Sequence, residues 1–168
     1  MQTPPNNQRP GDGYTPLDRI DRALLAALQK NARMSNKELA ELVGLAPSTC
    51  LERLRRLRDR GVLQGFHAAV DLAQLGRATQ ALVAVRLRVH DRRQIDAFHR
   101  HVIDHPDALS VFHVSGADDY LIHAAVKDTA HLRTLVLDLT AHPSVDHVET
   151  RLVFDFVRKH AVEPVDEA

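Results

Sequence analysis

Apolar residues in the first third of the chain recur at helical spacing, with short breaks between the runs. Leu17, Ile20, Leu24 and Leu28 are three or four residues apart, as on the buried face of an amphipathic helix. Two shorter apolar runs follow, over residues 39–43 and 51–57. The pattern predicts three helices, and we expect their common core to contain the first-helix leucines with Leu39, Leu42, Leu51 and Leu54.

The second predicted helix has a clear start signal, and a tight turn separates its end from the third helix. Ser35 followed by Glu38 is a capping box, in which the two side chains satisfy amide donors at a helix start. Gly44 can take the positive φ that ends a helix sharply, and Pro47 is tolerated at the first position of the next helix. Two helices joined in this way indicate a helix-turn-helix.

The stretch after the third helix alternates loosely between apolar and polar residues. Residues 62–70 therefore predict a short strand or hairpin, the wing of a winged helix-turn-helix made of three helices plus a short hairpin. We assign residues 17–66 to this domain and residues 67–77 to a hinge or linker strand.

Beyond Gly76 the apolar period changes, and strand patterns alternate with helical ones. The predicted elements are strands over 81–89, 108–115, 120–126 and 145–157, with helices around 95–102 and 132–139. The order βαββαβ is that of a ferredoxin-like domain, which we place at residues 78–160. The fold class is therefore α+β.

A sheet covered by helices on one face leaves its other face to be explained. We expect Val83, Val85, Val111 and Val153 to lie on that open face. An apolar face of this size is unlikely to remain in water, so the pattern predicts a homodimer formed through the sheets.

Composition narrows the class of protein. The 168 residues are 44% hydrophobic and 26% charged, as in ordinary globular domains. The sequence contains no run of eighteen apolar residues, so it predicts no membrane-spanning helix. Residues 1–16 and 161–168 read as loose tails. The single cysteine, Cys50, agrees with a reducing compartment, so we expect a cytoplasmic, nucleoid-associated protein without a membrane partner.

The net charge of zero hides two regions of opposite sign. Residues 17–65 hold ten Lys and Arg against six Asp and Glu, a net of +4, whereas residues 66–168 have a net of −4. The third predicted helix alone contains five arginines within residues 53–60. Such a helix is either a solvated face or a surface for a polyanion, and the preceding turn favours double-stranded DNA.

Within that helix, side chains of two kinds suit DNA. Arginine matches phosphate oxygens and guanine edges, while hydroxyls near the helix start can face bases. We expect Ser48, Thr49, Arg53 and Arg56 to contact bases or nearby phosphates, and Arg55 to contact phosphates or solvent.

Several motifs together resemble the Lrp/AsnC family of transcriptional regulators. The matching segments are LDRIDR at 17–22, LQKNARMSN at 28–36, VGL at 43–45, CLER at 50–53, GVLQG at 61–65 and VSGADDY at 114–120. The likeness covers about residues 17–160. It implies an amino-acid-responsive regulator that binds pseudo-palindromic operators as dimers, which assemble further, often to octamers.

The resemblance also implies an effector site between neighbouring dimers. By position, its residues would be Ser115, Gly116, Asp118, Asp119, Tyr120, Thr140, Leu152 and Val153. Asp118 or Asp119 can pair with an effector ammonium, and amides of the Gly116 loop can receive its carboxylate. The alternative for the Gly116 segment is simply a well-formed hairpin turn. Ala46 departs from the family pattern, because many members have a capping Ser or Thr there.

Two other functions compete with the regulator hypothesis. Eleven histidines, among them His99, His101 and His105, raise the prospect of a metal-dependent enzyme, but we expect no metal, no cofactor and no catalysis because no ligand or nucleophile motif is present. An architectural protein that wraps DNA with little effector control is the second alternative. The favoured function is a sequence-specific DNA-binding regulator that responds to an amino acid or related metabolite.

Overall fold

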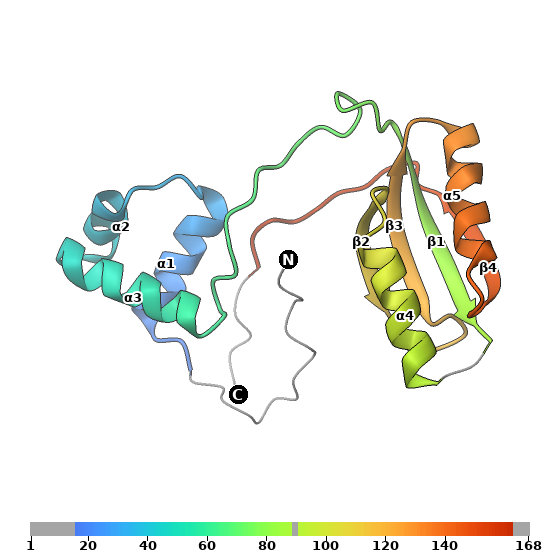
Figure 1. Cartoon of the computed structure of the whole chain (residues 1–168). Helices are drawn as coiled ribbons and strands as arrows, with labels where there is room; N and C mark the ends of the chain where they lie inside the picture. Colours follow the sequence, from blue (N-terminus) through green and yellow to red (C-terminus); the bar gives the residue numbers. More distant parts are fainter. Residues whose placement is uncertain (1–15, 89–90, 163–168) are drawn as a thin grey trace. The chain divides into compact units, whose positions relative to one another are not determined.

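The computed structural model of the chain describes residues 16–88 and 91–162, and these residues form two compact units (Figure 1). Of the predicted tails at 1–16 and 161–168, residues 1–15 and 163–168 lie outside the described residues. The first unit contains the chain up to Ala68 together with the segment that begins at Arg158, and the second extends from Ala69 to Val157. The boundary after Ala68 falls inside the predicted hinge, whereas residues 158–162 group with the first unit.

The described part of the first unit consists of three helices: α1 (Arg19–Lys30), α2 (Asn36–Val43) and α3 (Pro47–Asp59). Their buried core consists of Leu24, Leu28, Leu39, Ala40, Cys50 and Leu54. The expectation that Leu42 and Leu51 complete this core is wrong, because these side chains are 59% and 39% exposed. A three-helix unit buries only one narrow stripe of each helix, and sequence spacing alone does not show how wide that stripe is.

The predicted wing is not formed. Residues 62–70 contain no strand, and the described chain offers no segment that pairs with them. The amides of Val62 and Leu63 instead donate to the carbonyl of Leu57, and Leu63 packs on the helical core. A hairpin needs two strands that satisfy each other's backbone groups, and residues 62–70 contain neither.

The second unit has the predicted βαββαβ order. Its elements are β1 (Thr79–Leu87), α4 (Arg92–Ile103), β2 (Ala108–His113), β3 (Tyr120–Val126), α5 (Thr129–Ala141) and β4 (Val145–Leu152). The strands form one antiparallel sheet in the order β2-β3-β1-β4. The ferredoxin-like prediction is confirmed, although β4 ends at Leu152, opposite Ala81 near the start of β1, rather than at residue 157.

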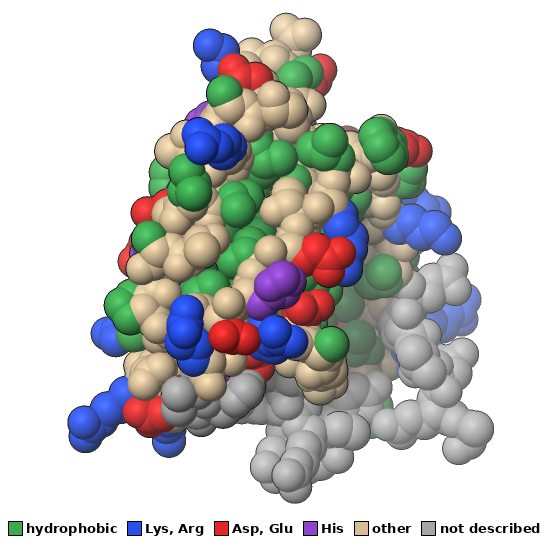
Figure 2. All heavy atoms as spheres, turned by 90° about the vertical axis from the view of Figure 1, so that its right-hand side faces the viewer, with side chains coloured by type: hydrophobic (Ala, Val, Ile, Leu, Met, Phe, Trp, Pro, Cys, Tyr) green, Lys and Arg blue, Asp and Glu red, His purple; other side chains and the backbone are tan. Residues whose placement is uncertain are grey.

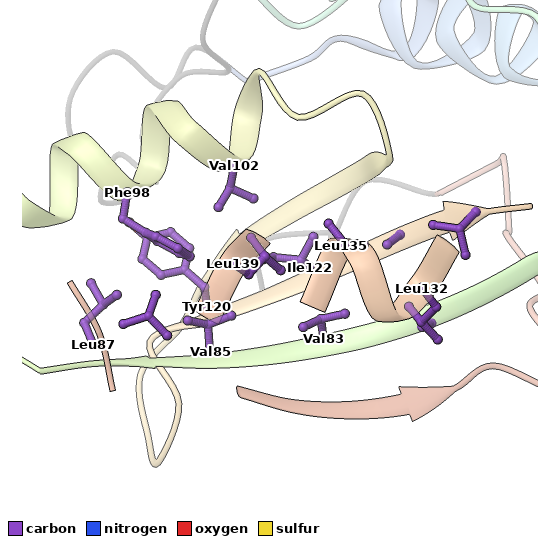
Figure 3. Close-up of a cluster of buried hydrophobic side chains, with 14 residues drawn as sticks. Val83, Val85, Leu87, Phe98, Val102, Tyr120, Ile122, Leu132, Leu135 and Leu139 are labelled. Atoms are coloured by element: carbon purple, nitrogen blue, oxygen red, sulfur yellow. The ribbon is translucent and has the colours of Figure 1, made fainter. Parts of the chain in front are cut away.

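The strand register decides which face of the sheet meets the helices. Val83 pairs with Ile122 and Val85 with Tyr120, and all four side chains are buried with Phe98 beneath α4 and α5 (Figure 3). Val111 also packs against this core. The expectation that Val83, Val85 and Val111 lie on the open face is therefore wrong. Alternation separates two faces of a strand, but tertiary packing decides which one is covered.

The opposite face of the sheet is formed by the residues that alternate, along each strand, with those that point into the core. Its exposed apolar members are Leu82 and Phe112, which are 36% and 52% exposed. Leu82 pairs with Arg151 and Ala84 with Glu149, so the β4 side is charged. Figure 2 looks onto the side of the molecule where α5 and β4 lie and shows apolar side chains mixed with charged ones.

Candidate functional site

The capping box fixes the start of α2, and a glycine ends this helix before the turn to α3. Ser35 N–H donates to Glu38 Oε2 at 2.6 Å, and Glu38 N–H donates to Ser35 Oγ at 3.3 Å. The bond from the Ser35 backbone lowers the pKa of Glu38. Gly44 ends α2 with φ +69°, a conformation that favours glycine. The predicted capping box and turn are confirmed.

The start of α3 has no side-chain cap of its own. Ala46 occupies the N-cap position and Pro47 the first turn, as the sequence indicated. Asn36 of α2 reaches across and donates from Nδ2 to the Pro47 carbonyl at 2.8 Å. The α2 helix therefore helps to position the start of α3.

Four of the predicted DNA-contacting residues lie on the exposed side of α3. Cys50, Leu54 and Leu57 face the core, while the exposed set is Ser48, Thr49, Arg55 and Arg56. Burial raises the pKa of the Cys50 thiol, which keeps it neutral. One side of α3 thus holds the helix in place, and the other offers hydroxyls and guanidinium groups to solvent.

Arg53 is placed differently from the other arginines. One guanidinium nitrogen, Nη1, donates to Asp18 Oδ2 at 2.6 Å and to Asp21 Oδ1 at 2.8 Å. The Arg53 side chain is 20% exposed and that of Asp21 is 7% exposed. Arg53 therefore fastens α3 to the start of α1, a contact across 32 residues that helical spacing does not reveal.

In the second unit, the connection between β2 and β3 is a tight loop. Val114 N–H donates to the Asp119 carbonyl at 2.9 Å, and Gly116 has φ +128°. Ser115 and Gly116 are exposed, and Asp118 is half-buried. These three predicted effector residues thus lie together at one end of the sheet.

Asp119 and Tyr120 have structural partners. Asp119 Oδ2 accepts from Leu87 N–H at 2.7 Å, and Asp119 N–H donates to the Val85 carbonyl at 2.9 Å. Tyr120 is fully buried, with its ring 5.0 Å from Phe98 and stacked at 4.7 Å on His113. Burial, and then the charge of Asp119, raise the pKa of Tyr120. Both residues tie β3 to its neighbours.

The remaining predicted effector residues divide between the ends of the sheet. Thr140 is exposed near the end of α5, and its hydroxyl donates to the Val136 carbonyl at 2.7 Å. Leu152 pairs with Ala81, whereas Tyr120 pairs with Val85. Four residues along a strand span roughly 13 Å. The predicted site is therefore not assembled within a single chain: Leu152 and Val153 lie away from the loop that contains Gly116.

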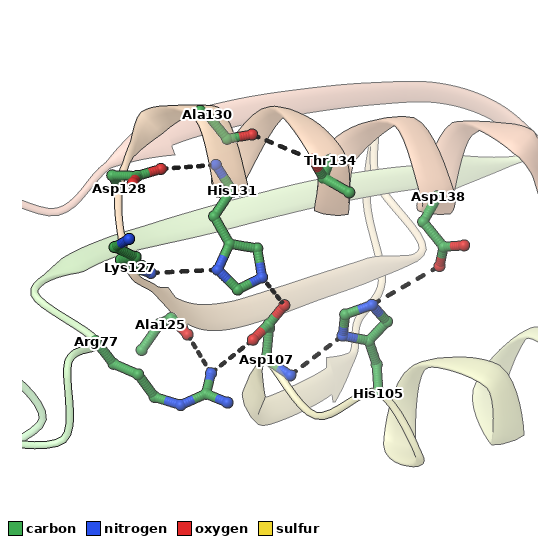
Figure 4. Close-up of polar contacts among 10 residues, drawn as sticks. All are labelled: Arg77, His105, Asp107, Ala125, Lys127, Asp128, Ala130, His131, Thr134 and Asp138. Atoms are coloured by element: carbon green, nitrogen blue, oxygen red, sulfur yellow. Dashed lines mark hydrogen bonds and ion pairs between the residues drawn. The ribbon is translucent and has the colours of Figure 1, made fainter.

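The structure also reveals a polar network that the sequence reasoning missed. Asp107, which precedes β2, pairs with Arg77 and with His131 (Figure 4). Its side chain is 6% exposed. No sequence signal points to it, because Arg77 and Asp107 are 30 residues apart and both residue types are common on surfaces.

The histidines near this network do not form a metal site. Asp107 N–H donates to His105 Nδ1 and Ser144 N–H donates to His142 Nδ1, which places the proton of each neutral ring on Nε2. Neither ring then has a lone pair free for a metal. Throughout residues 16–88 and 91–162, no three His, Cys, Asp or Glu side chains are placed to hold one.

No helix in residues 16–88 and 91–162 is long and apolar enough to cross a membrane.

Comparison with known proteins agrees with the two-unit architecture. Residues 17–58 match the AsnC-type helix-turn-helix domain, and residues 80–162 match the Lrp/AsnC ligand binding domain. The HTH-type transcriptional regulator AldR of Mycolicibacterium smegmatis is 40% identical over 161 residues, which cover 94% of this chain and 92% of AldR. The leucine-responsive regulatory protein of Escherichia coli is 35% identical over 155 residues, 92% of this chain and 93% of the relative.

A solved structure shows the same arrangement. The crystal structure of a transcriptional regulator from Neisseria meningitidis in complex with L-methionine aligns with a TM-score of 0.78 at 32% identity, covering 86% of this chain and 94% of that chain. The domain order, the relatives and the shared fold agree, and the chain belongs to the Lrp/AsnC family of transcriptional regulators, which pair a DNA-binding helix-turn-helix with a ligand-binding domain.

Proposed function

We propose that an amino acid or a related metabolite is the effector of this regulator and that it binds where copies of the ligand-binding domain meet. The observation that carries the proposal is the division of the predicted effector residues between two ends of the sheet. A junction between copies can bring such groups together, since each copy contributes a different end. The relative in complex with L-methionine and the relatives named leucine-responsive support this effector class.

Asp118 is the carboxylate proposed to pair with the effector ammonium. Asp119 already accepts from Leu87 N–H, whereas Asp118 lies half-buried beside the exposed Gly116 loop. Backbone amides of that loop would receive the effector carboxylate. Ser115 and Thr140, both exposed at the same end of the unit, would complete the polar contacts.

On the DNA side, α3 is proposed to read operators through its exposed face. Ser48 and Thr49 would contact base edges, and Arg55 and Arg56 would contact phosphates or guanine. Arg53 would act by positioning α3, because its guanidinium is held by Asp18 and Asp21.

Assembly into homodimers, and from dimers into octamers, is proposed to place two α3 helices on pseudo-palindromic half-sites. The open sheet face is the proposed dimer contact, with Leu82 and Phe112 as its apolar members. Phe112→Glu would put a charge into that contact. Sedimentation should show a shift to monomer, whereas unchanged assembly would exclude this face.

The effector test is thermal unfolding of the purified chain with each of the twenty amino acids. A compound that binds only the folded protein, at a hundred times its dissociation constant, adds about 2.7 kcal/mol. We expect a rise in melting temperature with one or a few amino acids, and its loss in Asp118→Asn. Asp155→Asn, which alters an exposed carboxylate elsewhere, should retain the response. No rise with any amino acid would exclude this effector class.

The DNA test separates a regulator from an architectural protein. A regulator should bind its operator about 4–10 kcal/mol more tightly than random DNA, whereas an architectural protein binds both similarly with steep salt dependence. Arg56→Ala should weaken binding and reduce the salt slope by about one. If a random duplex displaces operator DNA and non-operator DNA from the protein equally well, the architectural role is favoured.

A further inference from the structure

The buried carboxylate of Asp107 has no part in the contacts proposed above for DNA or effector. A charge taken out of water requires partners, and Asp107 has two, one on each oxygen. Arg77 Nη1 donates to Oδ1 at 2.6 Å, and His131 Nε2 lies 2.9 Å from Oδ2 (Figure 4). One carboxylate thus joins two segments that are far apart in the sequence.

The first partner, Arg77, closes the turn through which the linker enters the sheet. Arg77 N–H donates to the Leu72 carbonyl at 2.8 Å, and Gly76 N–H donates to the Ala73 carbonyl at 3.0 Å. The Arg77 guanidinium also donates to the Ala125 carbonyl of β3 at 2.6 Å. The chain between the helix-turn-helix and β1 passes through this turn, so Arg77 fixes the direction in which the linker leaves the ligand-binding unit.

The second partner, His131, lies in the first turn of α5. Lys127 N–H donates to His131 Nδ1 at 3.4 Å, so the neutral ring carries its proton on Nε2 and donates it to Asp107. The position of the start of α5 therefore determines whether Oδ2 of Asp107 is satisfied.

The same side of α5 is held again two turns later. Asp138, seven residues after His131, pairs with His101 of α4 at 3.1 Å and lies 3.8 Å from His105 Nε2. Asp107 N–H donates in turn to His105 Nδ1 at 3.2 Å. A displacement of α5 thus reaches Asp107 from two directions, directly through His131 and through Asp138 and His105.

We propose that Arg77, Asp107 and His131 are positioning residues that couple α5 to the linker turn at residues 72–77. The inference rests on the proposed function, because α5 carries Thr140, one of the proposed effector residues. When α5 shifts, His131 withdraws from Oδ2, and Asp107 compensates by moving relative to Arg77, which displaces the turn. A contiguous chain of ion pairs and hydrogen bonds is the kind of network that can carry such coupling, and the two experiments below measure it directly.

The first test uses hydrogen exchange of the full chain without any effector. His131→Gln should accelerate exchange of the Gly76 and Arg77 amides by at least about tenfold while the β3 core amides keep their wild-type rates. Arg86→Gln is the matched control, since it removes an ion pair with Asp146 on the β1–β4 edge of the same sheet and should leave the turn unaffected. An unchanged turn in His131→Gln, or equal acceleration of the whole unit, would overturn the coupling.

The second test measures regulation. Operator affinity is compared with and without the amino acid that gives the largest thermal shift, in wild type, Arg77→Gln, His131→Gln and the double variant. The fold-change in operator affinity that the amino acid induces should fall towards one in each single variant, and it should fall no further in the double variant. The dissociation constant of the amino acid itself should change less than about threefold. A full wild-type fold-change in Arg77→Gln would overturn the proposal. A screen in which no amino acid binds would refute the effector class, whereas the exchange experiment would still decide the coupling.

Discussion

The two units of this regulator maintain their structures by different means. Among the described residues, the main core cluster of the helical unit has six buried members, and the capping box at Ser35 and the ion pairs of Arg53 add to it. In the ligand-binding unit, the described residues give a core cluster of fourteen buried members between a sheet and two helices. A small core supplies little surplus stability, so the helical unit depends on individual polar contacts that the larger unit can lose with less consequence.

The largest predicted effect compares one buried leucine in each unit. Leu24→Ala and Leu139→Ala both remove a side chain that is 0% exposed, and each should cost about 3 kcal/mol. In the helical unit this is a large part of the total, because a single core in a domain below about 70 residues rarely supplies more than 3–5 kcal/mol. Hydrogen exchange should therefore show α1–α3 unfolded in Leu24→Ala, with the sheet still protected. Loss of protection in both units would contradict the comparison.

The second prediction concerns Arg53. Arg53→Ala leaves Asp21 buried without its partner, and we expect a loss of about 2–3 kcal/mol, at the low side of buried pairs because Arg53 is partly exposed. Arg55→Ala, on the exposed side of the same helix, should change stability by less than about 0.5 kcal/mol. Denaturant titration checks both. Weak operator binding by Arg53→Ala at unchanged stability would restore the contact with bases or nearby phosphates that the sequence predicted.

The third prediction is a gain in the helical unit. Ala46→Ser supplies the missing cap of α3 at a position whose backbone is already extended, with φ −65° and ψ 144°. A capping hydroxyl contributes about 1 kcal/mol, and its benefit should appear as a higher melting temperature of the helical unit alone. No change would mean that solvent already satisfies the free amides at this helix start as well as a hydroxyl would.

The smallest prediction is a dependence on pH. The backbone N–H of Asp21, and next the Arg53 guanidinium, lower the pKa of Asp18 in the folded chain. The charge of Asp18 therefore stabilises the fold above its unfolded pKa of about 4 and ceases to do so as pH falls through the lower folded pKa. Asp18→Asn keeps a capping side chain, so its deficit should be only about 0.5 kcal/mol at neutral pH for this exposed residue. The deficit should vanish in acid, and a deficit independent of pH would exclude the charge as its source.

The sequence predicted local features better than distant ones, for a physical reason. The capping box joins residues three apart and β3 was placed at its observed bounds, because such features depend on neighbours along the chain. The face on which Val83 lies depends on its partner Ile122, 39 residues away. The placement of Arg53 depends on Asp21, 32 residues away. Periodicity gives the phase of a strand or helix, but the packing partner decides which phase is buried.

The candidate site follows the same division. The residues around Gly116 were assigned to the site through the resemblance of residues 114–120 to a family motif, and the structure confirms only that a turn forms there. The burial of Tyr120 and the use of Asp119 by Leu87 depend on α4 and β1, which no local motif encodes. The network around Asp107 lacks even a motif, since its members become neighbours only once the sheet has formed.

The return of the chain to its first helix has a consequence for how such proteins recombine. Gln29 donates from Nε2 to the Val162 carbonyl at 3.1 Å and accepts from Val162 N–H at 2.7 Å. In topological terms the ligand-binding unit is therefore an insertion in a helical unit whose two pieces flank it. A gene fusion that exchanges effector domains between relatives would need two crossover points, one in the linker and one before Arg158, to keep the helical unit intact.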